Sequence, residues 1–125
     1  MIVLSATHAA QRAAAALQAT LTALNSGTTG AAIAIYATAR PAVGDAPGGD
    51  PLATFTLPKP AGAIDAGVLT LAPVDDAFIT ATGIALWARV SANGYTKFDC
   101  DVSDTAGTAT IRLATTQLYA GGSVR

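Results

Sequence analysis

The stretch Thr82–Val102 reads TGIALWARVSANGYTKFDCDV and decides the fold class. Its first half, Thr82–Val90, alternates as a strand does, with successive side chains pointing to opposite faces of a sheet. Asn93-Gly94 then supplies the residues that a two-residue hairpin turn requires. The returning half, Tyr95–Val102, alternates again between apolar and polar side chains. The stretch therefore predicts an antiparallel hairpin whose returning strand is half buried.

The alternation also assigns the faces of this hairpin. On the first strand one face carries Ile84, Leu86, Ala88 and Val90, and the other carries Ala85, Trp87 and Arg89. On the second strand the apolar face carries Thr96, Phe98, Cys100 and Val102, and the polar face carries Tyr95, Lys97, Asp99 and Asp101. We expect the large core anchors to be Trp87, Phe55, Phe78, Phe98 and Tyr36.

Further strands are expected on both sides of the hairpin. Short runs of β-forming residues, separated by turn residues, occur at Ala31–Tyr36, Leu52–Leu57, Gly67–Ala72, Thr108–Leu113 and Gln117–Val124. The fold class that these seven segments predict is mainly β, as a small antiparallel β-sandwich or jelly-roll-like domain.

One N-terminal helix, over residues 5–26, is predicted to precede the strands. Ser5 or Thr7 can cap it, and Gly27 can take the left-handed conformation that ends it. An apolar stripe at helical spacing runs through Ala10, Ala13, Ala14, Leu17, Leu21 and Leu24. We expect this stripe to pack on the domain's own sheet, across one end or edge, or on a neighbouring subunit. Residues 1–125 then form a single domain, with the β-sandwich over 31–125.

The composition is poor in charge and favours a protein that works in an assembly. Charged residues are 12% of the chain, about half the usual share, and all eight acidic residues are Asp. A surface with so few charges is poorly soluble as a free monomer, so we expect a homo-oligomer. The net charge is −1 without a basic run, and no apolar run reaches 18 residues. We therefore expect neither a nucleic-acid nor a membrane partner, and no signal peptide.

The residues that could carry chemistry are few, and we expect no enzyme, no cofactor and no metal. His8 is the single histidine and Cys100 the single cysteine. We interpret His8 as a solvated residue of the first helical turn and Cys100 as a buried small residue. Asp99 and Asp101 could form a carboxylate pair or, with Asp104, a cation site. We favour a solvated strand face followed by an Asp-rich turn.

The segment Arg40–Pro51, RPAVGDAPGGDP, is a long loop and the candidate protein interface. Its three prolines stiffen the backbone, and its three glycines permit unusual turns and close approach. Such a loop suits docking into a groove of a neighbouring subunit, although a surface loop without a role is the alternative. The candidate interface residues are Arg40, Pro41, Val43, Pro47 and Pro51.

An ordered set of segments resembles a family of small virion structural proteins of tailed bacteriophages and prophages. The set comprises the Ala-rich helix ending in Asn25-Ser26-Gly27, the segments IAIYATARPA, PLATF, AGVLTL, ATGIALWARV and FDCDV, and the final Thr115-Thr116 and AGGSV. The resemblance implies a tail-associated or capsid-associated subunit of the virion, assembled in the bacterial host cytoplasm, without catalytic residues. Relatives continue past AGGSV with a further β-rich tail, so the partner of the last strand stays open.

Three functions are compatible with these observations. The first is a non-enzymatic structural subunit of a tailed-phage virion, in the tail or at its tip, that contacts copies of itself and other virion proteins. The second is a decoration protein that clamps the capsid from outside. The third is a carbohydrate-binding or receptor-binding module, which would need an exposed aromatic platform; a hydrolytic module would need a carboxylate pair in a cleft.

Overall fold

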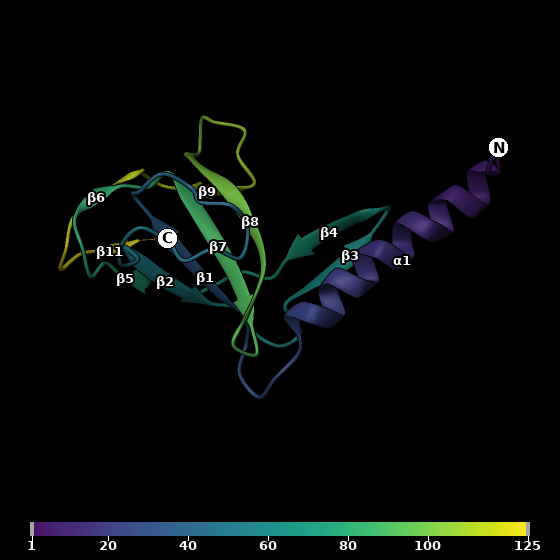
Figure 1. Cartoon of the computed structure of the whole chain (residues 1–125), viewed down its shortest axis with the longest axis horizontal. Coiled ribbons are helices and arrows are strands. Elements are labelled where there is room, and N and C mark those ends of the chain that lie inside the picture. Colours follow the sequence, from purple (N-terminus) through teal and green to yellow (C-terminus); the bar gives the residue numbers. More distant parts are fainter. Residues whose placement is uncertain (1, 125) are drawn as a thin grey trace.

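A computed structural model of the chain describes residues 2–124, and it shows a mainly β fold with one N-terminal helix (Figure 1). Strands hold 37% of the chain and the helix 15%, which confirms the expected fold class. The first and last residues of the expected domain 1–125 lie outside the described residues. The elements are α1 Ala6–Leu24, β1 Ala32–Tyr36, β2 Ala53–Thr56, β3 Gly62–Asp65, β4 Val68–Leu71, β5 Ala77–Phe78, β6 Gly83–Ile84, β7 Trp87–Ala92, β8 Tyr95–Asp104, β9 Ile111–Leu113, β10 Gln117–Leu118 and β11 Ser123–Val124.

The main sheet has five strands in the order β2-β1-β7-β8-β9. Its pairs are antiparallel except β8 with β9, which run parallel. The hairpin predicted from the sequence is its centre, and Asn93 and Gly94 turn it with φ of 54° and 80°. Two consecutive residues with positive φ characterise the type I′ turn, whose twist matches that of the strands.

Three two-stranded ribbons complete the β structure: β3 with β4, β6 with β10, and β5 with β11. The last strand therefore pairs with β5, Val124 opposite Ala77, which answers the question that the sequence left open. Strands β3 and β5 were not predicted from the sequence. Ribbons β6–β10 and β5–β11 lie at the end of the sheet farthest from α1 (Figure 1).

The main hydrophobic cluster is built largely from small and aliphatic residues, and β7 is buried on both of its faces. Of the expected aromatic anchors, Tyr36, Phe55 and Trp87 are buried and Phe98 packs at the edge of the core. Phe78 is 64% exposed, so its assignment to the core was wrong. It stands on the two-residue strand β5 directly after buried Ala77, and alternation then turns its side chain to solvent.

The predicted strand Thr82–Val90 is in fact two strands, and the break reverses part of the expected faces. Ala85 donates its N–H to Thr116, while Leu86 donates to Tyr36 on the main sheet. The chain crosses here from the small ribbon to the main sheet. As a result Ile84 and Leu86 are exposed and Ala85 is buried. Val90 is buried, which corrects the expectation that Ile84, Leu86 and Val90 lie on one face.

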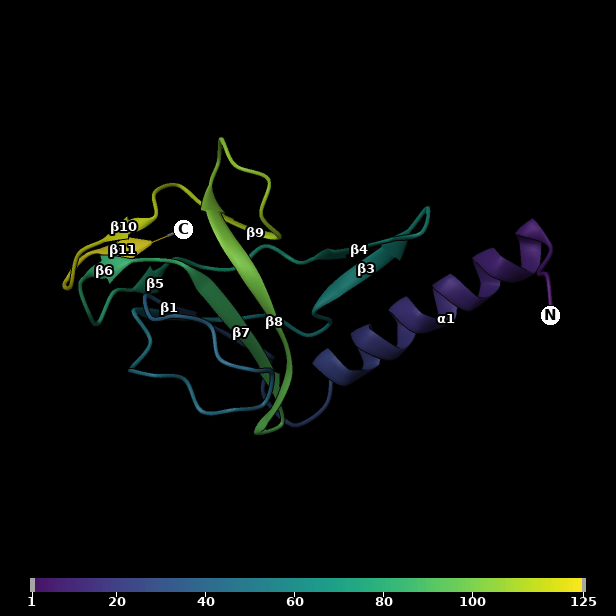
Figure 2. The ribbon, with the colours of Figure 1, turned by 45° about the horizontal axis from the view of Figure 1, so that its top comes forward.

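Helix α1 begins after Ser5, whose hydroxyl accepts the N–H of His8 at 3.2 Å, and ends at Leu24. Gly27 follows with φ of 84°, as expected for a residue that ends a helix. The helix contacts β3, β4 and the end of β7. Its N-terminal part projects away from the sheet in both views (Figures 1 and 2).

Candidate functional site

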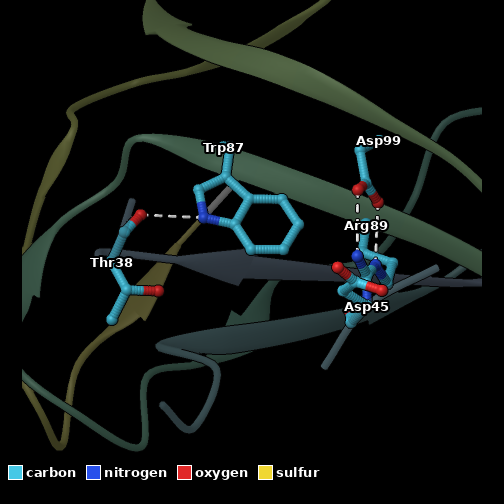
Figure 3. Close-up of polar contacts among 5 residues, drawn as sticks. All are labelled: Thr38, Asp45, Trp87, Arg89 and Asp99. Carbon is cyan, nitrogen blue, oxygen red and sulfur yellow. Dashed lines mark hydrogen bonds and ion pairs between the residues drawn. The ribbon is translucent and has the colours of Figure 1, made fainter. Parts of the chain in front are cut away.

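A buried ion pair lies at the centre of the main sheet (Figure 3). Arg89 on β7 stands opposite Asp99 on β8. Nε of Arg89 donates to Oδ1 of Asp99 at 2.8 Å, and Nη2 donates to Oδ2 at 2.9 Å. The side chains are 8% and 1% exposed, so the expectation that Asp99 lies on a solvated strand face was wrong. The hydrogen bonds that Arg89 donates to the Asp99 carboxylate raise the pKa of Arg89, so the guanidinium stays charged.

Trp87 packs beside this pair. Its ring stacks on Tyr36 of β1 with 4.6 Å between centroids, and Cζ of Arg89 lies 5.3 Å from the centroid of its ring. Its Nε1 donates to the carbonyl oxygen of Thr38 at 2.8 Å (Figure 3). Trp87 is thus a buried anchor whose ring N–H holds the segment that leads into Arg40–Pro51, which we call the Pro/Gly loop.

The Pro/Gly loop is tied to the ion pair. Nη1 of Arg89 donates to the carbonyl oxygen of Asp45 at 2.6 Å, so three nitrogens of one guanidinium hold β8 and the loop together. Residues 37–52 connect β1 to β2 without helix or strand. The loop therefore lies on the surface, and one of its backbone carbonyl oxygens accepts a hydrogen bond from the buried Arg89 side chain.

The five candidate interface residues do not present equally to solvent. The large apolar side chain of Val43 is 68% exposed to solvent. Arg40 is exposed as well. The three candidate prolines, Pro41, Pro47 and Pro51, are partly buried and shape the loop. Among the five candidates, Val43 and Arg40 are thus the residues exposed to solvent.

A pocket of about 300 Å³ opens at the foot of the loop. Arg40 and Asp101 bring opposite charges to it, and Leu86 and Trp87 bring apolar surface. Asp101 accepts the backbone N–H of Thr110 at 3.1 Å, and this bond holds the pKa of Asp101 below its usual value, with a smaller contribution from Arg40. This pocket could not be predicted from the sequence, because its walls come from three separate segments.

The other side chains that could carry chemistry do not come together in one site. Cys100 is buried, and burial raises the pKa of its thiol to about 11, with Asp101 and Asp99 adding to the effect. His8 is exposed on α1. Asp104 accepts the N–H groups of Ala106 and Gly107 in a turn. Within residues 2–124 no group of three metal-ligating side chains comes together.

Comparisons with protein-family models, curated proteins and solved structures find no match to this chain. Among the described residues, no helix has the length and apolar character needed to cross a membrane.

Proposed function

We propose that the chain is a non-enzymatic structural subunit of a tailed-phage virion, in the tail or at its tip, that acts through contacts with copies of itself and other virion proteins. The observation that carries this proposal is the exposure of α1, on which only Leu24 is buried. A helix that projects from a small domain, on a chain so poor in charge, is suited to contact with another protein surface. The family resemblance supports assembly into the virion in the host cytoplasm.

The surroundings of the reactive side chains support a structural role. Both carboxylate oxygens of Asp99 accept hydrogen bonds from Arg89, and one oxygen of Asp101 accepts a backbone N–H from the following turn. The thiol of Cys100 is protonated at neutral pH because its pKa is raised to about 11. These groups hold the sheet and its turns together, which accounts for their presence without a reaction.

The alternatives differ in location or in the surface they need. A capsid decoration protein would use the same protein–protein contacts, so only its place in the particle separates it from a tail subunit. A carbohydrate-binding module could not use Trp87 as its platform, because that ring is 2% exposed and stacked on Tyr36. We therefore rank the receptor-binding or carbohydrate-binding function last.

The test is the composition of purified particles. Virions from a lysate of the phage that encodes the chain should contain it in a fixed copy number by quantitative mass spectrometry. Labelled antibody should decorate tails in electron micrographs, whereas decoration of the capsid would favour the cement role. Absence of the chain from purified virions would refute the proposal.

A further inference from the structure

Helix α1 and the β3–β4 ribbon together form a projection that we call the arm, comprising Ala6–Leu24 and residues 62–71. Figures 1 and 2 both show the ribbon beside the C-terminal part of α1 and the helix continuing beyond it. Every side chain over Ala6–Ala16 is exposed. The arm therefore exposes about three turns of helix to solvent.

The contacts that support the arm are confined to its base. Leu24 is buried and Leu21 packs against the core, while the N–H of Ala61 donates to Oδ1 of Asn25 at 2.8 Å. A free two-stranded ribbon is marginal in water, and most of the stability of a helix comes from packing of one face. The outer part of the arm thus lacks the packing that normally stabilises a helix and a ribbon, as expected of a segment that packs against another protein surface.

The exposed area of the chain gives the size of that missing contact. Its accessible surface is 7478 Å². A compact monomer of the same mass exposes about 6,100 Å². The excess of roughly 1,400 Å² is more than the ~800 Å² that one partner buries in a standard protein–protein interface. An oligomer that covers the arm would bring the chain to the area expected of a compact protein.

The chemistry of the arm indicates which partner covers it. The stripe that packs at Leu21 and Leu24 continues past Leu17 to exposed alanines, at Ala10, Ala13 and Ala14. The only charged residue within α1 is Arg12. Nucleic acid needs a basic cluster, and a membrane surface needs bulky apolar residues beside basic ones, and α1 has neither. A second α1 fits, since small side chains let two helices approach closely and one charge per helix can point outward.

We propose that α1 packs along the stripe Ala10–Ala13–Ala14 against α1 of a second copy of the chain, and that this contact holds the homo-oligomer together. The proposal rests on the proposed function, because it names the partner of one surface of the assembled subunit. The Pro/Gly loop and its exposed Val43 lie on the sheet and are left for other contacts.

Cross-linking tests the contact directly in the full chain. In a Cys100→Ala background, Ala13→Cys should form a disulfide between copies under mild oxidation, since the stripes face one another. Gln18→Cys, exposed on the same helix but off the stripe, is the matched control and should cross-link far less. Equal cross-linking at both positions, or none at Ala13→Cys, would overturn the proposed face.

A charge on the stripe tests whether the contact holds the oligomer. By light scattering the natural chain should be an oligomer, Ala13→Lys should shift it to the monomer, and Gln18→Lys should leave it unchanged. Fluorescence of the single tryptophan reports that the sheet stays folded in each variant. A monomeric natural chain that is still present in virions would overturn this inference and leave the proposed function standing. An arm-dependent oligomer that is absent from virions would do the reverse.

Discussion

Arg89 and Asp99 face one another across β7 and β8, and the guanidinium that pairs with Asp99 also holds the carbonyl oxygen of Asp45 at 2.6 Å. Two charges with 8% and 1% of their side chains exposed are costly to take out of water. The cost is offset here by a bidentate pair and by a third hydrogen bond that uses the remaining side of the guanidinium. The pair therefore couples the sheet to the loop.

Arg89→Met should destabilise the fold strongly, because it leaves the Asp99 carboxylate and the Asp45 carbonyl without their donor. Breaking a buried pair by removing one partner costs about 3–5 kcal/mol. Urea unfolding followed by tryptophan fluorescence measures the loss. Arg89→Met with Asp99→Leu is the control, and it should recover much of the loss because no buried charge is left unpaired. A single variant as stable as the natural chain would mean that water reaches Asp99.

Trp87 should be a structural residue with two separable contributions. Trp87→Ala removes a buried ring that stacks on Tyr36, and such a truncation costs about 3–5 kcal/mol. Trp87→Phe keeps most of the ring but leaves the Thr38 carbonyl without its donor, which costs about 1–3 kcal/mol. Thermal and urea unfolding by circular dichroism compare the two. If Trp87→Ala melted like the natural chain, the ring would be dispensable to the core.

The strand hairpin was predictable because local rules fix it. Asn93-Gly94 determines the turn, and the alternation of Tyr95–Val102 marks that strand as half buried. Strand β7 is buried on both faces, which alternation did not predict. The partner of Arg89 was not predictable in the same way. A two-residue turn alone would set Arg89 opposite Phe98, but a bulge between Val90 and Ser91 shifts the register by one residue and brings Asp99 into place. No residue pattern in the sequence marks that bulge.

The contacts of the Pro/Gly loop were also predictable only in part. The Pro/Gly content of residues 40–51 predicted a surface loop, and Val43 is exposed as that prediction requires. The anchor at Asp45 was not predictable, since it is a backbone carbonyl that any residue would supply. The exposure of Leu86 also depends on tertiary structure, because the chain changes its pairing partner from Thr116 to Tyr36 at that point.

Cys100 should be unreactive in the folded chain and should make stability fall at alkaline pH. Burial raises the pKa of the thiol to about 11, so the folded chain keeps a proton that the unfolded chain releases near its ordinary value of 9.0. Stability from this group is complete below pH 9 and is lost as pH rises toward 11. At pH 8 a disulfide reagent should react roughly 100-fold more slowly than in urea.

The alkaline loss is separated from other titrations by comparison with Cys100→Ala. The difference in unfolding free energy between the two chains should change between pH 8 and pH 10.5 in the direction that penalises the natural chain. A constant difference, or a thiol that reacts as fast in buffer as in urea, would show that Cys100 is accessible.

The loop should separate into a part that stabilises the fold and a part that contacts a partner. Replacing residues 43–49 with a short Gly-Ser link removes the Asp45 carbonyl from Arg89, and a buried donor left without its acceptor costs about 1–3 kcal/mol.

Val43→Ser changes only an exposed side chain, so the unfolding free energy should stay within about 0.5 kcal/mol of the natural value. If the loop is an interface with another virion protein, Val43→Ser should still lower incorporation into particles. Ala42→Ser, at an exposed neighbouring position, is the matched control and should assemble normally. Normal incorporation of Val43→Ser would restrict the loop to its structural role of capping the Arg89–Asp99 pair.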